Sequence, residues 1–123
     1  MYQLDYSSSI PIYQQIIDET KKGLLKGYFS QGDKLPSIRE MAKTLLINES
    51  TVSKAYKEME AIGMIETVVG RGSFIALDRD KLKLRKEDYR QTLKMDFLEA
   101  FYLGYTEDEV IEILRETKRE VSR

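Results

Sequence analysis

The sequence predicts a mostly α-helical protein with a small β-hairpin: an N-terminal winged helix-turn-helix followed by a C-terminal hairpin of two helices. Three observations lead to this prediction. Two short amphipathic segments lie on either side of a tight turn, two β-prone segments surround a glycine-rich tip, and two long apolar helical stripes complete the chain. A helix, a turn, a second helix and a two-stranded wing occur in this order in winged helix-turn-helix domains. We expect that domain over residues 1–77 and a helical region over residues 78–123.

The composition limits the classes of function. Of the 123 residues, 41% are hydrophobic and 33% charged, as in a soluble globular protein. The sequence has neither an apolar run of membrane-spanning length nor the start of a signal peptide, so we expect a cytoplasmic protein that does not contact a membrane. It contains no cysteine and no histidine, which removes disulfides, thiolate metal sites and the commonest general base. We therefore predict no metal and no cofactor.

The charge balance does not by itself indicate a nucleic-acid partner. The net charge is −1, and acidic and basic residues are evenly matched in both parts of the chain. A DNA-binding surface would have to come from local placement of charge, because there is no overall excess of basic residues.

The first predicted helix covers about residues 11–26. Pro11 suits the first helical position, and Gly27 is placed to end the helix. Apolar or small side chains recur at three- and four-residue steps and form one stripe: Tyr13, Ile16, Ile17, Thr20, Leu24 and Leu25. This pattern is typical of a helix that packs against a core, and we interpret it so.

The helix-turn-helix is predicted from its capping residues. Ser37 and Glu40 form a capping box, which begins a helix that extends to about Leu45. The turn covers residues 46–48, and Asn48 is a suitable N-cap for a second helix over about residues 49–62.

The second helix has two different faces. Val52, Ala55, Tyr56 and Met59 share one, and Ser50, Ser53, Lys54 and Lys57 share the opposite one, with Thr51 at the leading end. Short hydroxyls and lysines suit entry into a DNA groove, where they can meet bases and phosphates. An ordinary solvated helix face has a similar composition, so this segment alone supports both interpretations equally.

The predicted wing consists of β-prone segments at 64–68 and 73–77, joined by residues 69–72. Its tip carries Arg71 between Gly70 and Gly72. An arginine at such a tip can enter a minor groove, whose negative potential attracts it. In isolation an exposed loop charge is the simpler interpretation, but a helix-turn-helix directly upstream favours the DNA contact.

The C-terminal region is predicted to form two helices that need a partner. A densely charged segment, 78–86, leads into an apolar stripe that ends near Gly104, and a second capping box, Thr106 to Glu109, begins the last helix. About 40 residues cannot bury this much apolar surface alone, so we expect a homodimer. The predicted dimer interface is Leu93, Phe97, Phe101, Val110, Ile113 and Leu114. The alternative is that Phe97, Phe101 and Tyr102 pack back on the winged domain.

Four runs of residues carry a family resemblance. They are GDKLPSIREMA at 32–42, NESTVSKAY at 48–56, GMI at 63–65 and GRGSF at 70–74. In this order and spacing they closely resemble the GntR family of bacterial transcription regulators, over about residues 10–77. The short two-helix tail is similar to that of the YtrA-like subfamily, whose C-terminal part dimerises and is too small for the effector-binding domains of other GntR proteins.

The resemblance implies a set of DNA contacts. Arg39 matches a family arginine that contacts the operator, Ser50 and Thr51 match positions at the start of the recognition helix, and residues 70–72 match the wing. Together with neighbouring polar positions, the predicted DNA-binding set is Ser37, Arg39, Asn48, Ser50, Thr51, Ser53, Lys54, Lys57, Gly70, Arg71 and Gly72. Glu49 and Ser53 depart from relatives that read guanine with arginines there. We therefore expect specificity to depend more on Arg39, Thr51, the wing and DNA shape.

The leading functional hypothesis is a homodimeric repressor that binds double-stranded DNA at a palindrome-like operator. The subfamily resemblance suggests a transporter operon as its target. The alternative is a protein-interaction module that uses the winged domain and the helical tail. An enzyme is the weakest hypothesis, because the carboxylates at 107–112 lie on the first turn of a capped helix, where the helix dipole favours them. A small-molecule effector could use an apolar cleft near Phe97, although a packed aromatic core is the simpler interpretation.

Overall fold

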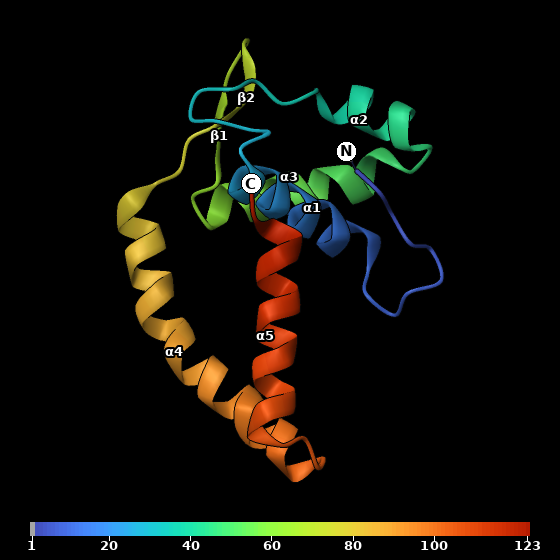
Figure 1. Ribbon diagram of the computed structural model, residues 1–123. Coiled ribbons are helices and arrows are strands. Elements are labelled where there is room, and N and C mark those ends of the chain that lie inside the picture. The colour runs from blue at the N-terminus through green and yellow to red at the C-terminus, as the bar shows by residue number, and fades with distance from the viewer. Residues whose placement is uncertain (1) are drawn as a thin grey trace.

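The computed structural model describes residues 2–123, which form five helices and one two-stranded antiparallel sheet (Figure 1). The described elements follow one another as α1 (Ile12–Lys26), α2 (Ile38–Leu45), α3 (Glu49–Ala61), β1 (Ile65–Val68), β2 (Gly72–Ile75), α4 (Arg79–Tyr102) and α5 (Glu107–Val121). In Figure 1, α1 to α3 and the β-hairpin form one compact body, and α4 and α5 extend from it as a V. The mostly α-helical fold with a small hairpin is as the sequence predicts.

The buried core lies within the winged helix-turn-helix. It combines one face of α1, the inner faces of α2 and α3, and the base of the hairpin. Ile16, Val52, Ala55 and Met59 are fully enclosed. Burial of the three larger side chains, Ile16, Val52 and Met59, contributes roughly 1.5–3 kcal/mol each, so this body has its own source of stability. Most of the apolar stripe predicted for the first helix lies on the side of α1 that the core buries, but Leu25, at the end of the stripe, is 57% exposed.

Helix ends follow the local signals in the sequence. The Ser37 hydroxyl accepts from the Glu40 N–H at 3.0 Å, and the Glu40 carboxylate accepts from the Ser37 N–H at 3.2 Å. Thr106 and Glu109 form the same reciprocal pair at the start of α5. Gly27 ends α1 in the left-handed region, with φ of 82°. These capping predictions are confirmed, because each motif depends only on residues within one turn of helix.

Asn48 is the N-cap of α3, as the sequence predicts. Asn48 occupies the N-cap position of α3 with extended backbone, but its side chain accepts no hydrogen bond from the helix in the part of the chain described. Its backbone carbonyl instead accepts from the Thr51 N–H at 3.1 Å. The first turn is therefore held through the main chain, and the exposed Asn48 amide is left for other partners.

The wing is an antiparallel pair with Ile65 opposite Ile75 and Val68 opposite Gly72. Both isoleucines are buried, whereas Val69 at the tip is 98% exposed. The wing is also joined to the connector before α2, because the Leu35 N–H donates to the Ser73 carbonyl at 2.8 Å. The base of the wing is fixed to the core while its tip extends into solvent.

The helices α4 and α5 form an open V rather than a closed hairpin. They meet near residues 103–106 and diverge from there (Figure 1). Asp78 is the N-cap of α4 and accepts from the N–H groups of Asp80 and Lys81, so the rest of the charged segment, residues 79–86, is helical. The far end of α5 lies beside α1, where Arg123 Nε donates to the Leu25 carbonyl at 3.5 Å.

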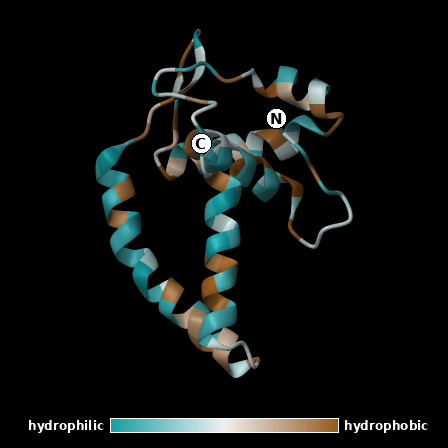
Figure 2. Ribbon diagram, in the orientation of Figure 1, coloured by the Kyte–Doolittle hydropathy of each residue, from teal (hydrophilic) through white to brown (hydrophobic). Residues whose placement is uncertain are grey.

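Apolar side chains on the V are uncovered. Of the residues described, none in α4 or α5 is buried. Phe97, Phe101 and Tyr102 are 45%, 51% and 82% exposed, so the alternative in which they pack back on the winged body does not occur in this structure. Figure 2 shows hydrophobic positions along both arms of the V. None of the helices formed by residues 2–123 has the length and apolarity that crossing a membrane requires.

Candidate nucleic-acid interface

The start of α2 presents Arg39 to solvent. The reciprocal Ser37–Glu40 hydrogen bonds fix the first turn of this helix, and they hold the pKa of the Glu40 carboxyl below its ordinary value. Glu40 therefore stays ionised, and its charge lies at the N-terminus of α2, where the helix dipole stabilises it. Arg39 is exposed on the same turn and is free to contact a phosphate or a base edge.

The hydroxyl group of Tyr56 sets the position of α2 relative to α3. It donates to the Pro36 carbonyl at 2.6 Å, immediately before the capping box. Burial raises the pKa of Tyr56, so the phenol keeps its proton and remains a donor. Sequence reasoning assigned Tyr56 to the buried face of α3 but did not predict this contact, because it joins residues 20 positions apart.

The outer side of α3 has the composition of a recognition helix. Asn48, Ser50, Lys54 and Lys57 are exposed, and Thr51 and Ser53 are half-buried at its edges. The buried face of the same helix packs in the core, so the outer side is held in a fixed orientation. The structure therefore brings the predicted α3 residues together on one side of one helix.

Lys54 is directed toward α1. Its ammonium lies 4.0 Å from the centre of the Tyr13 ring, a cation–π contact between α3 and the start of α1. Sequence reasoning treated Tyr13 as a packing residue and did not connect it with Lys54. The contact restricts the lysine on the side of α3 that faces α1, so its positive charge has a defined position next to the outer face of the helix.

The wing tip supplies the third set of predicted contacts. Arg71 is exposed, and its N–H donates to the Val68 carbonyl at 2.9 Å, which closes the turn. Gly70 and Gly72 have φ of 79° and 118°, values that only glycine adopts without strain, so the turn requires glycine at both positions. In Figure 1 the wing tip and α2 lie on the upper side of the molecule, and the α4–α5 apex points the opposite way.

The six residues predicted to form a dimer interface line one cleft. This cleft, of about 520 Å³, lies between α4 and α5 on the inner side of the V. Its lining is mostly apolar and also includes Ala100, Tyr105 and Glu107. Within the described residues, no group of three or more histidine, cysteine or acidic side chains is arranged to hold a metal ion.

The α2–α3 pair and the wing together define a winged helix-turn-helix DNA-binding protein. The model of the family described as bacterial regulatory proteins, gntR family, matches residues 12–75. This chain belongs to that family of DNA-binding transcription regulators, a class that is not enzymatic.

Relatives extend the match beyond the winged part. The HTH-type transcriptional repressor YtrA of Bacillus subtilis is 42% identical and aligns with 98% of this chain and 95% of its own length. A crystal structure described as a transcriptional antiterminator from Listeria monocytogenes is 37% identical, with a TM-score of 0.89 over 98% of this chain and 92% of that one. A GntR-family transcription factor named YtrA from Sulfolobus acidocaldarius is 38% identical, with a TM-score of 0.60 over 75% of this chain and 97% of that one. Two of these matches span the α4–α5 region as well as the winged part.

Proposed function

We propose that the protein is a homodimeric transcriptional repressor that binds a palindrome-like operator in double-stranded DNA. The observation that carries the proposal is that Arg39, the outer side of α3 and Arg71 are exposed on three elements that one core holds together. Such a surface can present α3 to a major groove while the wing tip meets the adjacent minor groove. The repressor assignment is supported by the name of the Bacillus subtilis relative.

The proposal divides the chain by function. Residues 1–77 bind DNA, and residues 78–123 join two copies through the cleft of the V. A second copy would cover apolar side chains that are exposed in the single chain, among them Phe97, Phe101 and Leu114. Two linked winged bodies would read two half-sites, which raises affinity well above that of one small module.

The operator and its genes are proposed by analogy. Resemblance to the YtrA-like subfamily suggests an operon for a membrane transporter as the target. An effector, if the regulator uses one, would be a small apolar compound in the cleft between α4 and α5. Because the DNA partner is chromosomal, the proposal places the protein in the cytoplasm.

The test is fluorescence anisotropy with a labelled duplex from the DNA upstream of this protein's own gene, compared with a scrambled duplex at several salt concentrations. We expect a preference of roughly a thousandfold for the upstream duplex, with a steep salt dependence. R39A and R71A should each weaken operator binding by about 5- to 150-fold and lower the salt slope. K43E, at an exposed position on the outside of α2 beyond the predicted contact set, is the control for a change of charge.

The alternative function is a protein-interaction module. A monomer at micromolar concentration that does not bind either duplex at low salt would favour it over the repressor. Unchanged operator affinity in both R39A and R71A would show that the proposed contact residues are wrong.

A further inference from the structure

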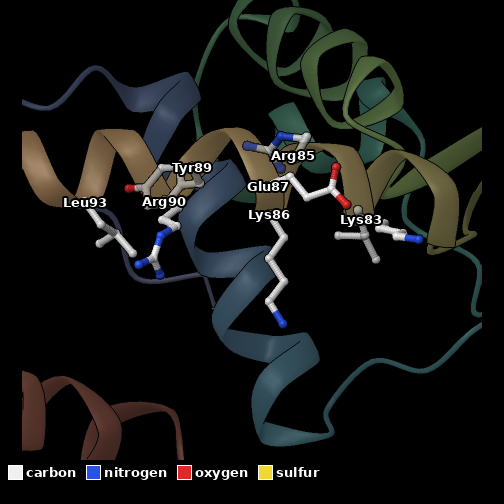
Figure 3. Close-up of a pocket in the computed structure, with 8 residues that line it drawn as sticks. Lys83, Arg85, Lys86, Glu87, Tyr89, Arg90 and Leu93 are labelled. Atoms are coloured by element: carbon white, nitrogen blue, oxygen red, sulfur yellow. The ribbon is translucent and has the colours of Figure 1, made fainter.

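The first half of α4 presents an uncovered face that is both apolar and basic. Leu82, Tyr89 and Leu93 share this face by their spacing and are 40%, 50% and 43% exposed. They line a groove of about 830 Å³ together with Lys83, Arg85, Lys86, Glu87 and Arg90 (Figure 3). Residues 79–93, which we call the basic arm, contain six basic and three acidic side chains, a net charge of +3.

The apex of the V has the opposite charge. Residues 94–117, which we call the acidic apex, contain seven acidic and two basic side chains, a net charge of −5. They form most of the apolar cleft, whose lining includes the carboxylate-bearing Glu107. Over the described residues, Glu112 is the one charged group of the arm or apex with an ion-pair partner within 4.0 Å, namely Arg119. The remaining charges of both surfaces lack such a partner among residues 2–123.

We propose that the basic arm of one copy lies in the cleft of the acidic apex of a second copy, and the reverse, so that the two α4 helices run antiparallel. This inference rests on the homodimer proposed above and adds its geometry and register. The apolar side chains of the arm would fill the cleft, and the lysines and arginines beside them would face the acidic rim. Charge complementarity of this kind fixes which arrangement of two surfaces is preferred.

Leu93 fixes the register. It lines both the groove of the basic arm and the cleft of the acidic apex, so it is the point at which the two surfaces join within one chain. In the proposed two-fold dimer, the basic arm of each copy contacts the acidic apex of the other copy. The two-fold axis must therefore pass close to Leu93, where the two α4 helices cross.

A dimer in which the two α4 helices run parallel is unfavourable. It would place basic arm against basic arm and acidic apex against acidic apex, which costs free energy through like-charge repulsion. In the antiparallel arrangement, Arg79 begins α4 14 residues before Leu93. At ~1.5 Å per residue, the starts of the two α4 helices lie ~42 Å apart. The two winged bodies therefore lie at opposite ends of the antiparallel dimer.

The experiment reverses the charges of each surface separately in the full-length chain. The arm variant is K86E/R90E and the apex variant is D96K/E107K, all at exposed positions where substitutions seldom disturb folding. Dimer dissociation constants are measured by sedimentation at low salt. Each variant alone should dimerise roughly tenfold or more weakly than the parent, because both of its interfaces become repulsive. An equimolar mixture of the two should recover dimers close to parental strength, and so should the quadruple variant.

The controls separate this proposal from the dimer itself. K43E/K57E makes the same change of charge on the winged body and should leave dimerisation unchanged, while circular dichroism confirms that every variant is folded. If neither charge reversal changes the dimer dissociation constant, the antiparallel register is wrong, although the homodimer itself is still supported. A mixture that fails to recover dimers would do the same. A parental chain that stays monomeric would overturn both proposals.

Discussion

The two parts of this molecule differ in where their apolar side chains are covered. In the winged part, Val52, Ala55 and Met59 are fully buried by neighbours in the same chain. In the V, residues of the same hydrophobic character, such as Phe97 and Leu114, are about half exposed or more. Both parts have an amphipathic helix that begins with a capping box, α2 in the winged part and α5 in the V. The difference shows that an amphipathic pattern predicts a helix and a buried face but does not say which chain buries it.

The largest expected effect is a loss of stability that does not depend on protein concentration when the winged part is changed, but does depend on it when the V is changed. M59A should lower the free energy of unfolding by about 2–5 kcal/mol at every protein concentration, because it creates a cavity in the intramolecular core. F97A should leave the winged part nearly as stable and lower only the concentration-dependent contribution of the dimer. Thermal melts at several concentrations test this. A concentration-independent loss of the same size in F97A would show that Phe97 belongs to the core.

The next effect concerns how the core positions the DNA-binding surface. Y56F removes the hydroxyl that donates to the Pro36 carbonyl at 2.6 Å. Loss of such a hydrogen bond should cost about 1 kcal/mol of stability and weaken operator binding, since it loosens α2 beside α3. Chemical unfolding and anisotropy measure the two effects. Y28F, at an exposed tyrosine on the connector after α1, is the matched control. Equal operator affinity in Y56F and the parent would contradict the positioning role.

A smaller effect is expected from the contact between Tyr13 and Lys54. Cation–π contacts at exposed sites contribute about 0.5–1 kcal/mol, so a double-mutant cycle with Y13L and K54A should give a coupling of that size in operator binding. The coupling arises because the ring holds the ammonium beside the recognition face. Y13F keeps the aromatic ring and should behave as the parent does. Additive effects of Y13L and K54A would mean that the contact does not influence DNA binding.

The smallest effect is an acid dependence from the α2 capping box. Hydrogen bonds from Ser37 lower the pKa of Glu40, so the native state binds a proton at this carboxyl less readily than the unfolded state. The resulting stabilisation is present above the ordinary pKa that the carboxyl has in the unfolded state, and it is lost as the pH falls through the lower native pKa. Stability measured between pH 3 and 6 should show this slope in the parent and a flatter slope in E40Q. Identical slopes in the parent and in E40Q would show that the Ser37–Glu40 capping box does not cause the pH dependence.

The sequence determined the local structure of this protein. Capping boxes at Ser37 and Thr106, the glycine after α1 and the glycines at the wing tip define elements within a few residues of themselves, so they were predictable in position and type. The predicted DNA-contact residues on α2, α3 and the wing are likewise exposed or half-buried. Their roles in binding stay predictions that R39A and R71A test.

Only the tertiary structure decided which distant residues meet. The Tyr56–Pro36 hydrogen bond and the Lys54–Tyr13 contact join segments 20 and 41 positions apart, so no local pattern contains them. The same holds for the opening of the V. The apolar stripes of α4 and α5 predict a packed pair, yet the end of α5 lies beside α1, and the arms diverge from the apex. Local sequence fixes short-range hydrogen bonds and helical faces, whereas the approach of distant segments depends on the balance of packing over the whole chain.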